Sequence, residues 1–142
     1  MNHSDYMLLA LDVSKKALPA CVPNPPVGCV LVKNGKVVSK GFTQSIGGNH
    51  AEVEAINQYS GSLRGVTAYV TLEPCAFEGR TPSCAKMLAE SNISNVVIAL
   101  MDPDLRNNGQ GINVLKKSGV NVIVGISEHD VAKFITPYLG KS

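Results

Sequence analysis

The sequence predicts an α/β fold with a mixed five-stranded sheet and helices on both of its faces. The strongest signal is Asn34-Gly35, a typical hairpin turn between an apolar run at 27–32 and a second strand at 36–42. Three further strand patterns then alternate with helical patterns, and they cover residues 66–72, 96–100 and 120–124. Strands joined by helical crossovers pair in parallel, so a hairpin followed by crossovers gives a mixed sheet.

The N-terminal helix is predicted to be capped by Ser4-Asp5 and to end at Pro19. Its apolar positions fall on one face and comprise Met7, Leu8, Leu11 and Leu18. Residues 22–26 are predicted to be extended, because a residue before proline is pushed out of the helical region.

The remaining helices are predicted from apolar spacing and from their end signals. They cover residues 50–59, Ser83 or Cys84 to about Ser91, residues 111–117, and residue 128 to about residue 138. Gly119 stands where a left-handed cap would end the third of these. The sequence has no repeat and no linker, so residues 1–142 are predicted to form one domain.

Composition excludes several functional classes. The 44% hydrophobic and 17% charged content of the 142 residues is typical of a globular chain. A net charge of +2 is too small to indicate a nucleic-acid partner, and the basic pairs Lys15-Lys16 and Lys116-Lys117 are predicted to face solvent. With no apolar run near 18 residues and no secretory signal, we expect a cytoplasmic protein without a membrane span.

Four residues form the clearest chemical motif. His50 and Glu52 are two positions apart, Cys75 follows Pro74, and Cys84 comes after eight intervening residues. Catalytic zinc takes three nitrogen or sulfur ligands from the protein and keeps one position for water. We predict that His50, Cys75 and Cys84 hold Zn²⁺ and that Glu52 moves protons. This H-x-E and P-C pattern with a later cysteine is typical of zinc deaminases.

Topology also favours this site. His50 opens a helix after a strand and loop, and Cys75 follows the carboxyl end of another strand, where ligands gather in open α/β sheets. Cys84, in the first turn of its helix, gains thiolate character from the helix dipole. Glu52 could take a proton from zinc-bound water, and the hydroxide would attack an amidine carbon of a heteroaromatic ring. Ammonia would leave and a carbonyl would remain.

A purely structural zinc site is the alternative, but such sites usually have four protein ligands. Cys21 and Cys29 are interpreted as free thiols, with zinc ligation by Cys21 the less favoured reading. Asp102-Pro103-Asp104 could hold Mg²⁺, although this pattern is more often a turn.

Further stretches match a known family, and they comprise residues 23–28, 50–53, 69–75 and 79–82, Cys84 and Asp102-Pro103. From about Met7 to Gly125 the sequence resembles the deaminase domain of the bifunctional riboflavin-biosynthesis deaminase/reductases (RibD), within the cytidine deaminase-like superfamily. The eight-residue gap between the cysteines favours this branch, because most relatives that act on cytidine or tRNA adenosine have two residues there.

The resemblance implies a three-layer αβα sandwich, one zinc ion and deamination of a small-molecule substrate, a phosphoribosylated diaminopyrimidinone. It implies that Asn24 contacts the pyrimidine, the amide of Ala51 its ring carbonyl and Arg80 the phosphate, with Thr81 and Asp102 lining the pocket. It also implies a homo-oligomer. Because the sequence stops at Ser142, we expect a reductase to be supplied as a separate protein.

Several positions depart from the family pattern, and they comprise Thr43, Ala76, Phe77, Glu78 and Asp104. Two of them are acidic on the side where the family binds the sugar phosphate, and an acidic residue repels phosphate. The alternative is therefore a RibD-like deaminase of a non-phosphorylated or differently decorated pyrimidine, purine or pterin. A tRNA adenosine deaminase and a non-catalytic binding domain are the other hypotheses.

Overall fold

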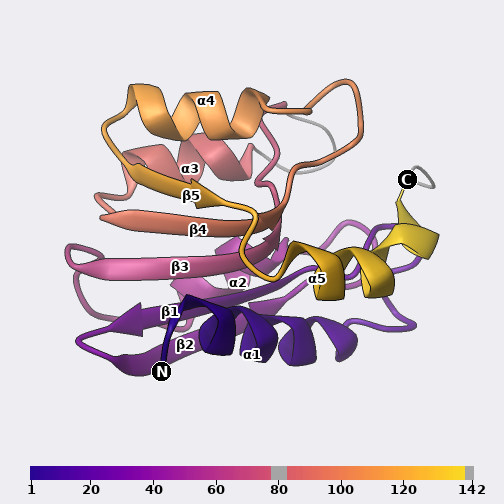
Figure 1. Cartoon of the computed structure of the whole chain (residues 1–142), viewed down its shortest axis with the longest axis horizontal. Coiled ribbons are helices and arrows are strands. Elements are labelled where there is room, and N and C mark those ends of the chain that lie inside the picture. Colours follow the sequence, from indigo (N-terminus) through magenta and orange to yellow (C-terminus); the bar gives the residue numbers. More distant parts are fainter. Residues whose placement is uncertain (78–82, 140–142) are drawn as a thin grey trace.

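The computed structural model describes residues 1–77 and 83–139, and Figure 1 shows a sheet flanked by helices. The strands are β1 (Gly28–Lys33), β2 (Lys36–Phe42), β3 (Val66–Leu72), β4 (Asn95–Leu100) and β5 (Asn121–Val124). The helices are α1 (His3–Lys15), α2 (Ala51–Asn57), α3 (Cys84–Glu90), α4 (Gln110–Lys117) and α5 (Glu128–Ile135), and α5 continues into the 3₁₀ turn η1 (Thr136–Tyr138).

The strand order is β2-β1-β3-β4-β5. β1 is antiparallel to both β2 and β3, whereas β3, β4 and β5 are parallel to one another. This arrangement follows from the sequence, because the 34–35 turn makes a hairpin and the later strands are joined by helices. The predicted mixed five-stranded sheet is confirmed.

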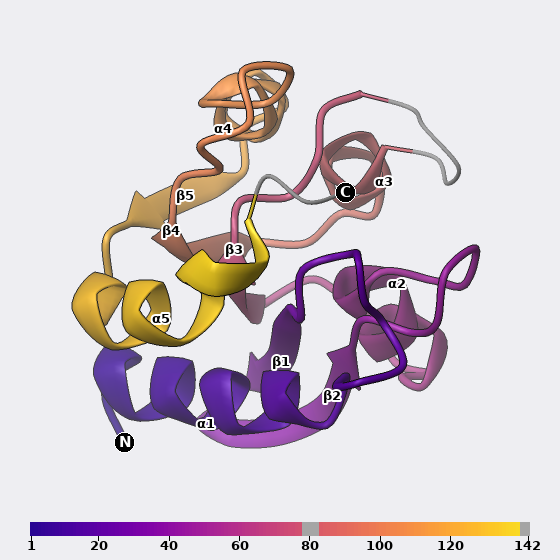
Figure 2. The ribbon, with the colours of Figure 1, turned by 90° about the vertical axis from the view of Figure 1, so that its right-hand side faces the viewer.

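Helices cover the sheet on both faces, as Figure 2 shows. Alternate strand residues point to opposite faces. On one face, Leu31, Val70 and Ile98 pack in a core with residues of α2, α3 and α4. On the other face, Val30 and Val97 pack in a core with residues of α1 and α5. The predicted three-layer αβα sandwich is therefore confirmed.

The start of α1 differs from the prediction. Asn2 caps the helix by accepting the N–H of Asp5 at 2.9 Å, and the Asp5 carboxylate accepts the N–H of Asn2 at 3.0 Å. This reciprocal pair is a capping box. Ser4 lies inside the helix, so the predicted Ser4-Asp5 cap was two residues late.

The end of α1 also differs. The helix ends at Lys15, and the next N–H groups bond to carbonyls three residues back before Pro19 is reached. This tightening satisfies main-chain groups in the last turn. Turns then continue to Asn24, whose N–H donates to the carbonyl of Cys21 at 2.8 Å. The extended segment predicted from residue 22 is therefore wrong for its first residues.

The register brings four segment ends to one edge of the sheet. Gly28 at the start of β1 pairs with Phe42 at the end of β2, and Leu72 at the end of β3 pairs with Leu100 at the end of β4. Because β1 is antiparallel to β3, its beginning lies beside the end of β3. The loops at this edge carry the predicted site residues.

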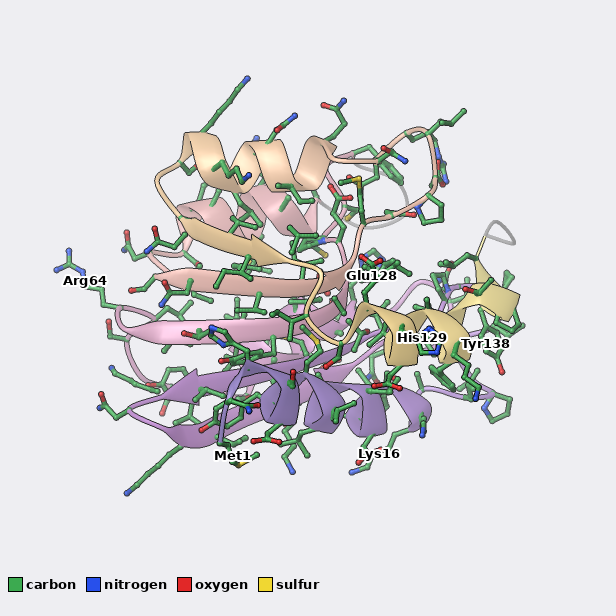
Figure 3. All side chains as sticks on the ribbon, in the orientation of Figure 1. Met1, Lys16, Arg64, Glu128, His129 and Tyr138 are labelled. Atoms are coloured by element: carbon green, nitrogen blue, oxygen red, sulfur yellow. The ribbon has the colours of Figure 1, made fainter. Side chains whose placement is uncertain are left out.

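The basic pairs on α1 and α4 are exposed, as predicted. Figure 3 shows Lys16 and Arg64 projecting from separate parts of the surface. Within residues 1–77 and 83–139, no helix combines the length and apolar character needed to cross a membrane.

Candidate active site and metal centre

His50, Cys75 and Cys84 form a cluster at this sheet edge. Their ligand atoms all lie within 4.8 Å of one another. The Nδ1 atom of His50 is 3.1 Å from the sulfur of Cys84 and 3.9 Å from the sulfur of Cys75. His50 directly precedes the first residue of α2, and Cys84 is the first residue of α3.

The first turn of α3 holds Cys75 in place. The carbonyl oxygen of Cys75 accepts the hydroxyl of Ser83 at 2.8 Å and the N–H of Ala85 at 3.0 Å. Its sulfur accepts the N–H of Cys84 at 3.3 Å. A loop residue after β3 is therefore fixed to the start of a helix that also carries the other thiol.

The donor set fits zinc. One imidazole and two thiols are typical ligands, and tetrahedral coordination places such nitrogen and sulfur atoms about 3.6 Å apart. The distances of 3.1 and 3.9 Å to Nδ1 bracket that value. Cys21 and Cys29 are buried free thiols outside this cluster of described residues.

One of the two thiols, that of Cys75, already favours a negative charge. The pKa of Cys75 is lowered to about 4, because the Cys84 thiol, the His50 ring and the Cys84 N–H all stabilise its thiolate. The same contact raises the pKa of Cys84, which holds the proton donated to Cys75. The thiolate in turn raises the pKa of His50. A metal ion would replace these shared protons.

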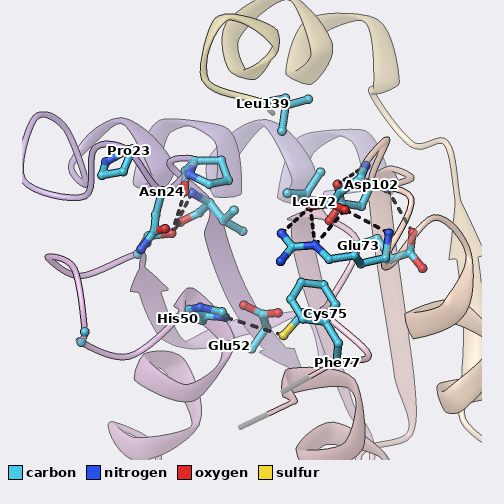
Figure 4. A pocket seen from close by; sticks show the side chains of 17 residues that line it. Pro23, Asn24, His50, Glu52, Leu72, Glu73, Cys75, Phe77, Asp102 and Leu139 are labelled. Carbon is cyan, nitrogen blue, oxygen red and sulfur yellow. Dashed lines mark hydrogen bonds and ion pairs between the residues drawn. The ribbon is translucent and has the colours of Figure 1, made fainter. Parts of the chain in front are cut away.

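Glu52 lies beside the cluster in the first turn of α2. Its side chain is buried, and Figure 4 shows its carboxylate between His50 and Cys75. Burial raises the pKa of Glu52 to about 7, and the His50 charge opposes this shift. A buried carboxyl group beside the ligands is well placed to exchange a proton with a molecule bound there.

A cavity of about 400 Å³ opens onto these groups. Its walls come from the segment before β1 and from those that follow β2, β3 and β4. The described residues that line it include Asn24, Thr43, His50, Glu52, Glu73, Cys75, Phe77, Asp102, Asp104, Arg106 and Leu139. Its volume suits a small heterocyclic ligand.

Residues 1–100 match the family model of the cytidine and deoxycytidylate deaminase zinc-binding region. The chain belongs to this deaminase family. The match confirms the deaminase class predicted from the sequence, and zinc as its predicted cofactor.

Two similar proteins and one similar structure indicate a particular branch of this family. The chain is 45% identical over 130 residues to the riboflavin biosynthesis protein RibD of Actinobacillus pleuropneumoniae, and the match covers 92% of this chain and 35% of that protein. It is 40% identical over 134 residues to the diaminohydroxyphosphoribosylamino-pyrimidine deaminase of Buchnera aphidicola from Schizaphis graminum, covering 94% and 91%. The structure of Acinetobacter baumannii RibD, form 2, superposes with a TM-score of 0.92 at 42% identity, covering 96% and 39%. The chain thus spans about a third of the length of the RibD relatives and most of the Buchnera deaminase.

The other predicted site residues fall into two groups. Asn24 and Asp102 line the cavity, and Ala51 is the first residue of α2, between His50 and Glu52. Contact between the Ala51 amide and a substrate stays a prediction. Arg80 and Thr81 lie outside the described residues.

The departures from the family pattern are also near the cavity. Thr43 is buried, and its hydroxyl oxygen accepts the N–H of Val27 at 3.0 Å and contacts the carbonyl of Pro25 at 3.2 Å. It therefore fixes the segment that carries Asn24. Phe77 and Asp104 line the cavity, Ala76 lies in the loop after Cys75, and Glu78 is outside the described residues.

Glu73 was missed by the sequence analysis. Its buried carboxylate accepts three main-chain N–H groups, from Asp102 at 3.0 Å, Gly109 at 3.0 Å and Ile112 at 3.1 Å. It therefore joins the end of β3 to the loop after β4 and to the start of α4. A polar residue directly after a buried strand was the available signal.

Asn107 was also missed, although its side chain is fully buried. Its Oδ1 accepts the N–H groups of Ala76 at 3.0 Å and Gly111 at 3.2 Å. Its Nδ2 donates to the carbonyl of Pro74 at 3.2 Å and to Asp102 at 3.3 Å. Asn107 thus orients the main chain on both sides of Cys75.

We predict that Glu73→Ala lowers the free energy of unfolding by roughly 3–5 kcal/mol, because three buried N–H groups would lose their acceptor. Urea denaturation measures this change. Glu90→Ala removes an exposed carboxylate from the end of α3 and should change stability by less than about 0.5 kcal/mol. Equal stability of the two variants would contradict the role assigned to Glu73.

Cys84→Ala should lower zinc affinity by at least about a hundredfold, because removing a ligand costs more than removing its supporting partner. Metal analysis after dialysis against a weak chelator would measure this. Cys21→Ala, a change at a buried thiol outside the cluster, is the control and should keep its zinc. Full zinc occupancy in Cys84→Ala would show that the ligand set is wrong.

Proposed function

We propose that this chain is a zinc-dependent hydrolytic deaminase domain that acts on diaminohydroxyphosphoribosylaminopyrimidine in riboflavin biosynthesis. The main support for this proposal is the cluster of His50, Cys75 and Cys84, whose ligand atoms lie within 4.8 Å of one another. His50 and Cys75 line the same cavity as Glu52. The identity to the Buchnera deaminase over most of both chains supports the substrate.

In this proposal His50, Cys75 and Cys84 hold zinc, which when bound supplies a Lewis acid that makes water nucleophilic near neutral pH. Glu52 takes a proton from the attacking water and delivers it to the departing amine. Its buried position keeps bulk solvent from competing for that proton. Water is consumed, ammonia leaves, and the ring carbon keeps a carbonyl.

Substrate binding is proposed to use the cavity walls. Asn24 would orient the pyrimidine from the segment before β1, and Asp102 would face it from the loop after β4. The Ala51 amide, at the start of α2, would donate to the ring carbonyl. Arg80 and Thr81 are proposed for the phosphate side by resemblance.

A homo-oligomer and a reductase supplied as a separate protein stay predictions, as does a cytoplasmic location. Four free cysteines, two of them in a zinc-ligand cluster, agree with a reducing compartment. Light scattering of the zinc-loaded protein would measure its oligomeric state.

Ammonia release tests the proposed reaction. The zinc-loaded protein should release one ammonia per phosphoribosylated diaminopyrimidinone and should act more slowly on the dephosphorylated compound. Cytidine, deoxycytidylate and a pterin are comparison substrates. Faster deamination of any of these than of the pyrimidinone would contradict the riboflavin assignment.

Glu52→Gln should lower kcat by about 10²–10⁴-fold, because the amide cannot accept and return a proton. Zinc content should be unchanged, since Glu52 is not a proposed ligand. Glu54→Gln, on the same helix and outside the cavity lining, should leave kcat within about twofold of the wild type. Normal turnover by Glu52→Gln would remove it from the mechanism.

A further inference from the structure

The charges along the cavity wall are unevenly distributed. The described lining residues include four carboxylates and one guanidinium, namely those of Glu52, Glu73, Asp102, Asp104 and Arg106. Glu73 is occupied by three N–H donors. Asp102 accepts the N–H of Asp104 at 3.0 Å and the amide of Asn107 at 3.3 Å. These hydrogen bonds make the loop after β4 a fixed part of the wall.

Arg106 is held from two sides at the cavity edge. Its Nε and Nη2 donate to the carboxylate of Asp104, with a shortest distance of 2.7 Å. The main-chain N–H of Arg106 also donates to the carboxylate of Asp104 at 2.9 Å. On the other side, the guanidinium lies over the ring of Phe77 at 4.5 Å from its centroid. Asp104, Phe77 and Arg106 are called the rim triad below.

The rim triad leaves donor capacity for a ligand. A guanidinium carries five N–H donors in a planar fork, and Asp104 engages those on one side. The side chain of Arg106 is 60% exposed while it also lines the cavity, so a bound molecule can reach it. The remaining donors match the oxygen atoms of a phosphate monoester.

The ion pair between Asp104 and Arg106 also changes the effect that Asp104 has on a nearby phosphate. An isolated carboxylate would repel a phosphate, but Asp104 is neutralised by the adjacent guanidinium. Asp104 then acts as the group that fixes the direction of Arg106. The aromatic ring of Phe77 restricts the guanidinium plane further.

We propose that Arg106, oriented by Asp104 and Phe77, binds the phosphate of the substrate and selects the phosphorylated pyrimidinone. This inference rests on the proposed function and adds to it a second phosphate-binding cation, in addition to Arg80. The ligand class is a phosphate monoester attached to a heterocycle through a sugar. The rim triad is a specificity element, because it includes neither the proton-transfer group nor a proposed metal ligand.

The test is the effect of Arg106→Gln on two substrates. For the phosphorylated pyrimidinone, KM should rise by about 10- to 100-fold, because a charge-assisted hydrogen bond is lost, with kcat changed by less than about threefold. For the dephosphorylated compound, kcat/KM should stay within about twofold of the wild type. Arg106→Lys should recover part of the loss, since it keeps the charge without the planar fork.

Arg64→Gln is the matched control, because Arg64 is exposed in the loop before β3 and outside the cavity lining. It should behave as the wild type on both substrates. An unchanged KM for the phosphorylated substrate in Arg106→Gln would overturn the inference. So would an equal loss on both substrates, which would indicate a structural role.

A binding experiment separates this inference from the proposed function. Calorimetry measures how the zinc-loaded wild type and Arg106→Gln proteins bind ribose 5-phosphate and ribose. If the wild type released no ammonia from either pyrimidinone, the proposed function would fail. Preferential binding of ribose 5-phosphate that disappears in Arg106→Gln would still support the phosphate contact. Equal binding of ribose 5-phosphate by both proteins would overturn it.

Discussion

The geometry of the site depends on the hydrogen bonds that the carboxylate of Glu73 accepts. Glu73 stands one residue beyond β3 and receives N–H groups from the loop after β4 and from the first turn of α4. Burying a carboxylate is unfavourable unless hydrogen bonds replace its water, and three main-chain donors do so here. The same bonds satisfy main-chain groups that would otherwise be left without partners at the helix start. One side chain therefore sets the relative positions of two adjacent strand ends and a helix.

Asn107 and Gly111 extend this constraint toward the cluster of His50, Cys75 and Cys84. The carbonyl of Pro74 accepts the amide of Asn107, and a Cβ added at Gly111 would collide with the same carbonyl oxygen. Helix α4 therefore packs directly against the residue before Cys75. The loop is directed back to α3, where Ser83 and Ala85 bind the carbonyl of Cys75. A continuous set of contacts leads from the loop after β4 to the thiols of Cys75 and Cys84.

The cluster of His50, Cys75 and Cys84 could be predicted because the chemistry of zinc binding limits the choice of side chain. Few residue types bind zinc. Strands β2 and β3 run in the same direction on either side of the antiparallel β1, so their ends lie at one edge, and His50 and Cys75 could be associated from the sequence. Glu73 and Asn107 could not, because their partners are mostly main-chain groups that every residue possesses. Their role depends on burial and direction, which appear only once the β4–α4 loop is placed.

Two local predictions were wrong, namely the start of α1 and the conformation of the segment before β1. Asn2 and Ser4 are both good helix caps, and the reciprocal bonds between Asn2 and Asp5 decided the helix start. The segment before β1 was predicted from its prolines alone, whereas bonds to the carbonyls of Pro19 and Cys21 keep it in turns as far as Asn24. In both places, the hydrogen bonds available to the main chain outweighed the conformational preference of single residues.

Asp104 shows the same limit for electrostatics. The sequence alone shows only that Asp104 is acidic, on the side of the cavity that the resemblance assigns to the phosphate. In the folded chain its carboxylate is bound by Arg106, which lowers the pKa of Asp104, and the guanidinium also covers Phe77. A ligand at the cavity edge meets the field of an ion pair, in which the cation is the more exposed partner. The side chains of Phe77, Asp104 and Arg106 thus form one connected unit. The charge of Asp104 alone therefore does not decide which substrate the cavity accepts.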